Sequence, residues 1–317
     1  MISFRFHVVS LTAVFLAIAI GVLVGTTYVE GAVVDGLENR IDTVEENLDS
    51  RRAENDRLDD DLQDARAYID ASQDYVVTDR LTDEPTLLLA VRGVDEDAVQ
   101  QVALLTGRAG AVLPGVVWLE DRWTLENDED EAALEAVLGD SAPEGGSREE
   151  LQRSAWEAVM AEVSAPEPGP GASAPSSTIE PLIAEGFLSV DALEDVETSI
   201  DDLRRADPGV AIVRGGGAPD ELEALVPVVV EAAVAAGRPT VAADVFEEVP
   251  EGAGRGEELV DSLSEDLREQ IALVDGAERT EGQVAVVLAL DAVAAGVTGH
   301  FGTGDGASGI LPEWTPP

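Results

Sequence analysis

Few side chains in this sequence could bind a soft metal. It contains no cysteine, two histidines, His7 and His300, and two methionines, Met1 and Met160. A high-affinity Cu(I) site needs such side chains in clusters, and the sequence contains none. Carboxylates are plentiful and could hold harder cations weakly. We therefore expect no metal-binding and no cofactor-binding residue.

A catalytic triad is only formally possible. His300, Asp305 and Ser308 lie close together in the sequence, and a Ser-His-Asp set can act as nucleophile, base and orienting acid. No other feature supports this arrangement. We expect no catalytic residue and predict that the chain is not an enzyme.

Two glycine-rich stretches could contact phosphate groups. The stretch 302–306 (GTGDG) follows an expected helix, whereas a dinucleotide fingerprint needs a strand before it and a helix after it. Gly215 to Gly217 follow an expected strand and open an expected helix, so their amides could hold an anion. The surroundings are strongly acidic and no GK[ST] follows. We interpret both stretches as turns.

The charge balance narrows the choice of partners. The chain of 317 residues has 65 acidic residues, 19 basic residues and a net charge of −46. Such a chain repels nucleic acid and anionic lipid surfaces, so neither is expected as a partner. An acidic surface of this kind suits salty surroundings, where ions screen the charges.

The stretch from Val8 to Val29 contains no charged residue. It is long enough to cross a hydrocarbon core of about 30 Å. The alternative is a cleaved signal peptide, whose apolar core is usually about 7–15 residues long. We favour a retained, single-pass anchor over residues 1–30. Arg5 on the short side places the N-terminus in the cytoplasm and the bulk of the chain outside the cell membrane.

Small residues recur within this span. Ala17, Gly21 and Gly25 are spaced by four and fall on one helix face. Such a face lets two spans approach closely. Alternatively, these glycines only reflect the frequency of glycine in membrane helices.

A heptad pattern occupies residues 31–74, which we call the stalk. Its core positions are apolar except for two, at strict 3–4 spacing, which is typical of a coiled coil. The predicted core consists of Val34, Leu37, Ile41, Val44, Leu48, Arg51, Asn55, Leu58, Leu62, Ala65 and Ile69. Two spans that enter one membrane in the same direction give a parallel dimer. The alternative is one amphipathic helix that packs on its own C-terminal domain or on a partner protein.

The polar core positions weaken the predicted dimer. A buried Asn such as Asn55 favours dimers in fixed register at a cost in stability, and Arg51 is hard to bury. Between parallel helices, the pairs Arg40–Glu45 and Asp61–Arg66 attract and the pair Glu54–Asp59 repels. These charges favour self-association only slightly.

Residues 83–317 are expected to form an extracytoplasmic α/β domain. Short apolar strands alternate with helices, which predicts a mostly parallel, Rossmann-like sheet. Expected strands cover 86–91, 210–213, 240–243 and 271–274, and a further apolar run over 111–119 is broken by Pro114 and Gly115. Expected helices cover 95–105, 131–138, 151–163, 219–236 and 281–295. Asp95 is a candidate N-cap, Pro227 predicts a kink or two shorter helices, and residues 164–177 form a flexible loop.

Several segments resemble a known family. The opening ISFRFHVVSLTAVFLAIAIGVLVGTTYV, the heptad stalk, GQVAVVLALDAV and the tail GHFGTGDGASGILP resemble the actinobacterial MctB family, also called SteB-like. The resemblance covers the chain from end to end, and its specific parts are the opening and the tail. It brings no agreed catalytic residue.

The resemblance implies a function in the cell envelope. The family label implies copper transport or homeostasis, and copper enters only through this label. Some relatives pair with a neighbouring membrane protein and are linked to the control of cell-wall hydrolases. The first hypothesis is therefore a membrane-anchored, non-enzymatic copper protein that acts as a dimer and docking scaffold. The alternative is a division or envelope factor that regulates a cell-wall hydrolase through its coiled coil.

Overall fold

The computed structural model describes residues 4–164, 177–193, 199–203, 206–246, 257–304 and 306–313. The chain divides into two compact units, Met1–Tyr68 and Ile69–Pro317. The loop predicted over residues 164–177 lies almost wholly outside the described residues.

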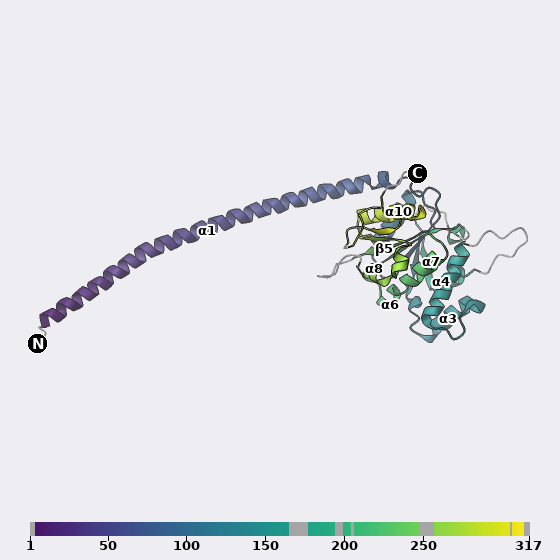
Figure 1. Cartoon of the computed structure of the whole chain (residues 1–317), viewed down its shortest axis with the longest axis horizontal. Coiled ribbons are helices and arrows are strands. Elements are labelled where there is room, and N and C mark those ends of the chain that lie inside the picture. The colour runs from purple at the N-terminus through teal and green to yellow at the C-terminus, as the bar shows by residue number, and fades with distance from the viewer. Residues whose placement is uncertain are drawn as a thin grey trace, which may run out of the picture. The chain divides into compact units, whose positions relative to one another are not determined.

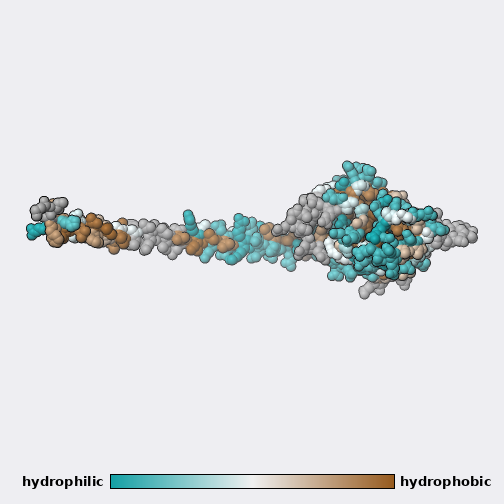
Figure 2. Space-filling view, turned by 90° about the horizontal axis from the view of Figure 1, so that it is seen from below, coloured by the Kyte–Doolittle hydropathy of each residue, from teal (hydrophilic) through white to brown (hydrophobic). Residues whose placement is uncertain are grey.

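The first unit consists of most of one helix, α1 (Phe4–Val77), which is drawn in purple to blue in Figure 1. Its first stretch, Phe4–Gly25, has a mean hydropathy of 2.6, and none of it is buried. Figure 2 shows apolar residues covering this end of the helix. A helix of this length and composition fits a membrane protein.

The last turns of α1 belong to the second unit, where Val77 is fully buried. Asp74 forms an ion pair with Arg108 at 3.2 Å. The hydroxyl of Thr280 donates a hydrogen bond to Asp70 at 2.5 Å.

The second unit is built on a seven-stranded sheet in the order β3-β2-β1-β4-β5-β6-β7. All neighbouring strands are parallel except β3, which pairs antiparallel with β2. The strands are β1 (Thr86–Val91), β2 (Val116–Leu119), β3 (Leu188–Asp191), β4 (Gly209–Gly215), β5 (Thr240–Val245), β6 (Ala272–Asp275) and β7 (Gly299–Phe301). The predicted mixed α/β class with a mostly parallel sheet is confirmed.

Helices cover both faces of this sheet. They are α2 (Glu96–Arg108), α3 (Asp128–Leu138), α4 (Arg148–Ser164), α5 (Ile179–Ala184), α6 (Asp220–Glu223), α7 (Val226–Ala235), α8 (Glu257–Ser262), α9 (Glu265–Arg268) and α10 (Thr280–Ala294). Short 3-10 turns are η1 (Asp121–Thr124), η2 (Gly139–Ser141) and η3 (Ile200–Leu203).

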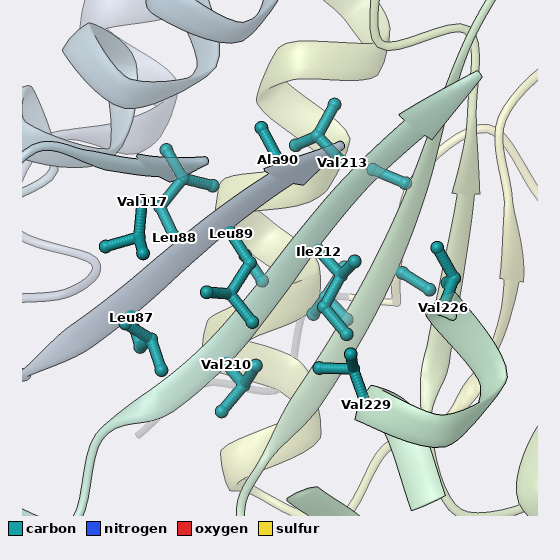
Figure 3. Packing of buried hydrophobic residues seen from close by; sticks show 14 of the residues in the cluster. Leu87, Leu88, Leu89, Ala90, Val117, Val210, Ile212, Val213, Val226 and Val229 are labelled. Atoms are coloured by element: carbon teal, nitrogen blue, oxygen red, sulfur yellow. The ribbon is translucent and has the colours of Figure 1, made fainter. Parts of the chain in front are cut away.

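The central strands are apolar at nearly every position because both of their faces are covered. Figure 3 shows the side chain of Ile212 of β4 near that of Val229 of α7. On the opposite face, α2 packs against α10, and Gly209 approaches the side chain of Leu290. The core therefore lies on both sides of β1 and β4.

One crossover has the less common hand. Figure 1 shows α10 and α7 on opposite sides of the sheet. The β4-α7-β5 and β6-α10-β7 units step across the sheet in the same direction, so their hands are opposite. The β1-α2-β2 unit steps across the sheet in the other direction, and α2 lies on the same face as α10. The β1-α2-β2 unit therefore has the same hand as the β4-α7-β5 unit. Since nearly all such crossovers are right-handed, the left-handed one is β6-α10-β7.

Most expected elements are confirmed, with shifted ends. Asp95 caps α2, accepting hydrogen bonds from the amides of Asp97 and Ala98. The expected helix over 219–236 is divided into α6 and α7, with Pro227 in the first turn of α7. In the apolar run over 111–119, only the part after Pro114 and Gly115 forms a named strand, β2. β3 and β7, which are short, were not predicted from the sequence.

Candidate functional site

The predicted stalk core forms an exposed apolar stripe on α1. Its apolar members from Leu37 to Leu62 are each about half exposed, between 48% and 56%. The core positions Arg51, Asn55 and Ala65 are exposed, Ile69 is half-buried in the second unit, and the side chain of Val34 lies outside the described residues. Figure 2 shows apolar patches among polar residues along this part of the helix.

The small residues of the span are also open. A methyl group added at Gly21 or Gly25 would meet no atom within 4 Å. Ala17 is exposed in the same helix. These positions could accept a close neighbour, and the coiled coil and the helix pairing stay predictions.

At the edge of the sheet where its parallel strands end, the switch point between β1 and β4 is the usual ligand site of an open α/β sheet. Here the two turns touch each other. A Cβ on Gly93 would lie 2.7 Å from the carbonyl oxygen of Gly217, and one on Gly215 would collide with the carbonyl oxygen of Val245. The turns after β1 and β4 therefore lie in backbone contact at the switch point.

The turn after β4 uses its amides internally. The Gly215 amide donates to the carboxylate of Glu223 at 3.1 Å, and the Gly216 amide donates to the carbonyl of Val245 at 3.1 Å. The helix that follows, α6, spans only four residues. Gly215 ends β4, and Gly216 and Gly217 form the expected turn.

A buried charged cluster lies beside this turn. Arg214 at the end of β4 forms an ion pair with Glu223 of α6 and lies 3.9 Å from the carboxylate of Asp244 in β5. Arg214 is 7% exposed and Asp244 is 1% exposed. Buried charges need partners, and this cluster ties together two strands and a helix.

A second charged cluster connects the antiparallel edge strand β3 to β1 and β2. Arg92, directly after β1, binds both carboxylate oxygens of Glu120, at 2.6 and 3.1 Å. Its guanidinium lies 4.2 Å from the ring centroid of Trp118, whose indole N–H donates to Asp191 of β3 at 2.7 Å. Burial acts to raise the pKa of Glu120, but the hydrogen bonds from Arg92 and Ser189 outweigh it and lower that pKa.

The third cluster joins β6 to the glycine-rich tail. His300 of β7 donates through Nε2 to the buried carboxylate of Asp275 at 2.9 Å. The amides of Thr303 and Gly304 donate to the same carboxylate at 2.8 and 2.9 Å. Burial acts to raise the pKa of Asp275, but these three hydrogen bonds outweigh it and lower that pKa.

The hydrogen bonds to Asp275 define the conformation of the tail at residues 302–304. The turn at 302–304 wraps the Asp275 carboxylate, so the interpretation of the tail as an ordered turn is confirmed for these residues. The hydroxyl of Ser308 donates to the backbone carbonyl of His300 at 2.7 Å, not to its imidazole, and Asp305 lies outside the described residues. Asp275 was not among the residues predicted for a site, although it directly follows an expected strand at the edge where parallel strands end.

The soft-metal ligands in the described part of the chain have separate surroundings. Met160 is buried in the domain core, His300 is bonded to Asp275, and His7 is exposed on α1. Among the residues that the structure describes, no group of three or more His, Cys, Asp or Glu side chains could hold a metal ion.

Comparison with known proteins gives a consistent family. The family model described as "Copper transport outer membrane protein, MctB" matches residues 1–312. Proteins named "Copper transporter MctB" from Mycobacterium bovis and Mycobacterium tuberculosis are 24% identical to this chain over 321 residues. The match covers 98% of this chain and 99% of each relative. Since the family model spans nearly the whole sequence, this chain belongs to the MctB family.

Proposed function

We propose that this chain is a membrane-anchored, non-enzymatic component of copper transport that works as a parallel coiled-coil dimer. The observation that carries the proposal is the half-exposed apolar stripe of α1, which follows an apolar helix in a chain of a copper-transport family.

The anchor and its direction follow from the residues around the apolar helix. Arg5 lies on the short side, and the stretch beyond it leads into a strongly acidic remainder. Positive charge next to a span remains in the cytoplasm. The stalk and the α/β domain then lie outside the cell membrane.

The stalk is proposed to bring two copies together. Leu48, Leu58 and Leu62 are about half exposed. Burying their apolar surface against a second helix would stabilise the pair by roughly 25 cal/mol per Å². A second identical helix in parallel register covers the stripe and places the two Asn55 amides opposite each other. The polar layer at Arg51 and Asn55 makes this pairing weaker than a fully apolar seam.

The copper role is proposed to be indirect. The described residues hold no clustered metal ligands, and one charge-free span supplies no polar pathway for an ion. Copper is thus the cargo of an assembly in which this chain is the scaffold. Its second partner is a membrane protein of the same envelope system, which docks on the stalk. The family name supports this role over the control of a cell-wall hydrolase.

The proposal is tested with the full chain in detergent and in cells that lack the native gene. Analytical ultracentrifugation should give the mass of two chains. Replacing Leu48 and Leu58 with Asp should give monomers and should leave cellular copper at the level of the deletion strain. A wild-type monomer, or a monomeric variant that restores normal copper content, would refute the proposal.

A further inference from the structure

A hollow of about 260 Å³ lies beside the third charged cluster, at the β7 edge of the sheet. This volume is slightly below the range of about 300–1,000 Å³ typical of small-molecule sites, so a very small ligand would fit. Its lining consists of Val260, Asp261, Arg268, Leu273, Gly299, His300 and Gly306.

Arg268 gives this hollow its positive charge. Its Nε is buried and has no hydrogen-bond partner in the described part of the chain. Other arginines of the domain are paired, such as Arg92 with Glu120 and Arg238 with Asp207. Among the residues that the structure describes, no carboxylate forms an ion pair with Arg268, although the chain has a net charge of −46. The positive charge of the guanidinium at the wall of the hollow favours an anionic group there.

The other polar side chains of the hollow, His300 and Asp261, can accept hydrogen bonds. Because His300 donates through Nε2 to Asp275, a neutral imidazole leaves Nδ1 as an acceptor. An ionised Asp261 can only accept hydrogen bonds. The hollow therefore combines a donor group at Arg268 with acceptors at His300 and Asp261.

We propose that this hollow binds a small carboxylic acid with a hydroxyl or ammonium group on the neighbouring carbon. The carboxylate of the ligand pairs with the guanidinium of Arg268. Its hydroxyl or ammonium donates to His300 or Asp261, and its short carbon chain contacts Val260 and Leu273.

Three matched three-carbon acids test both halves of this recognition. L-Lactate carries a hydroxyl, L-alanine carries an ammonium and propionate carries neither. Saturation-transfer NMR with the full chain in detergent micelles measures the affinity of each. We expect L-lactate or L-alanine to bind, and we expect propionate to bind at least roughly tenfold more weakly because a charged or polar hydrogen bond is lost.

The variant Arg268→Gln removes the charge that holds the carboxylate, so it should weaken binding by roughly tenfold or more. Arg268→Lys keeps the charge and should retain part of the affinity. Arg108→Gln changes an arginine that pairs with Asp74 and should bind like the wild type. Thermal melting of each variant verifies that it folds.

Binding of L-lactate alone assigns hydroxy acids, binding of L-alanine alone assigns amino acids, and binding of both supports the shared recognition. The inference is overturned if the wild type binds neither acid, if propionate binds as tightly as they do, or if folded Arg268→Gln binds like the wild type. The binding measurements involve neither the copper content of cells nor the oligomeric state of the chain. Their outcome is therefore independent of the proposed function.

Discussion

The imidazole Nε2 of His300 lies 2.9 Å from the carboxylate of Asp275, which is fully buried at the end of β6. Two backbone amides of the tail donate to the same carboxylate. This single side chain therefore joins β6, β7 and the turn that follows them.

Replacing Asp275 with Asn should lower the free energy of unfolding of the domain by about 2–3 kcal/mol, because charge-assisted hydrogen bonds are lost in a buried site. Urea unfolding followed by tryptophan fluorescence measures it, since Trp118, Trp123 and Trp156 are buried in the domain. The exposed control Asp140→Asn should change the stability by less than about 0.5 kcal/mol. Equal effects of the two variants would argue against a special role for Asp275.

The carboxylates of Asp275 and Glu120 should contribute to the loss of stability of the domain at acid pH. The folded-state pKa values of Asp275 and Glu120 are lowered, so both stabilise the fold above their unfolded-state pKa values of about 4. That stabilisation is lost as the pH falls through the folded-state values. Stability measured between pH 6 and pH 3 should fall less steeply in Asp275→Asn than in the wild type. Parallel curves would contradict this linkage.

Gly93 and Gly237 form a matched pair for testing the closed switch point. Both have positive φ values, +102° and +71°, but a Cβ at Gly93 would strike Gly217 whereas one at Gly237 would meet no atom within 4 Å. Gly237→Ala should cost about 1 kcal/mol from backbone strain alone. Gly93→Ala should cost about 2 kcal/mol more, because the added methyl group forces the two turns apart. Similar unfolding midpoints for the two variants would show that the turns are not in contact.

The scaffold role predicts weak copper binding. Competition of the full chain with a Cu(I) chelator should give a dissociation constant weaker than about micromolar, because clustered soft ligands are missing from the sequence. His300→Ala should bind no less than the wild type. Tighter binding that depends on His300 would make the chain a copper carrier.

Local patterns predicted much of the fold. The apolar runs of β1, β4 and β5, the cap at Asp95 and the break before Pro227 follow from neighbouring residues, so the sequence alone reveals them. β3 is different, because three of its four residues are at least partly exposed and its side chains are held by Arg92 and Trp118. The partnership of Asp275 with His300 depends on β6 and β7 lying side by side through a crossover of unusual hand, which no local pattern contains.

The central claim is that two copies of the stalk meet along the apolar stripe in parallel register. Because the chain has no cysteine, single cysteines can report it by oxidative crosslinking of the full chain in detergent. Leu48→Cys, at a core position, should crosslink efficiently to the same residue of a second copy, whereas Ala53→Cys, on the outer face, should remain monomeric on a denaturing gel. Equal crosslinking at the two positions, or none at Leu48→Cys, would contradict the parallel coiled-coil dimer.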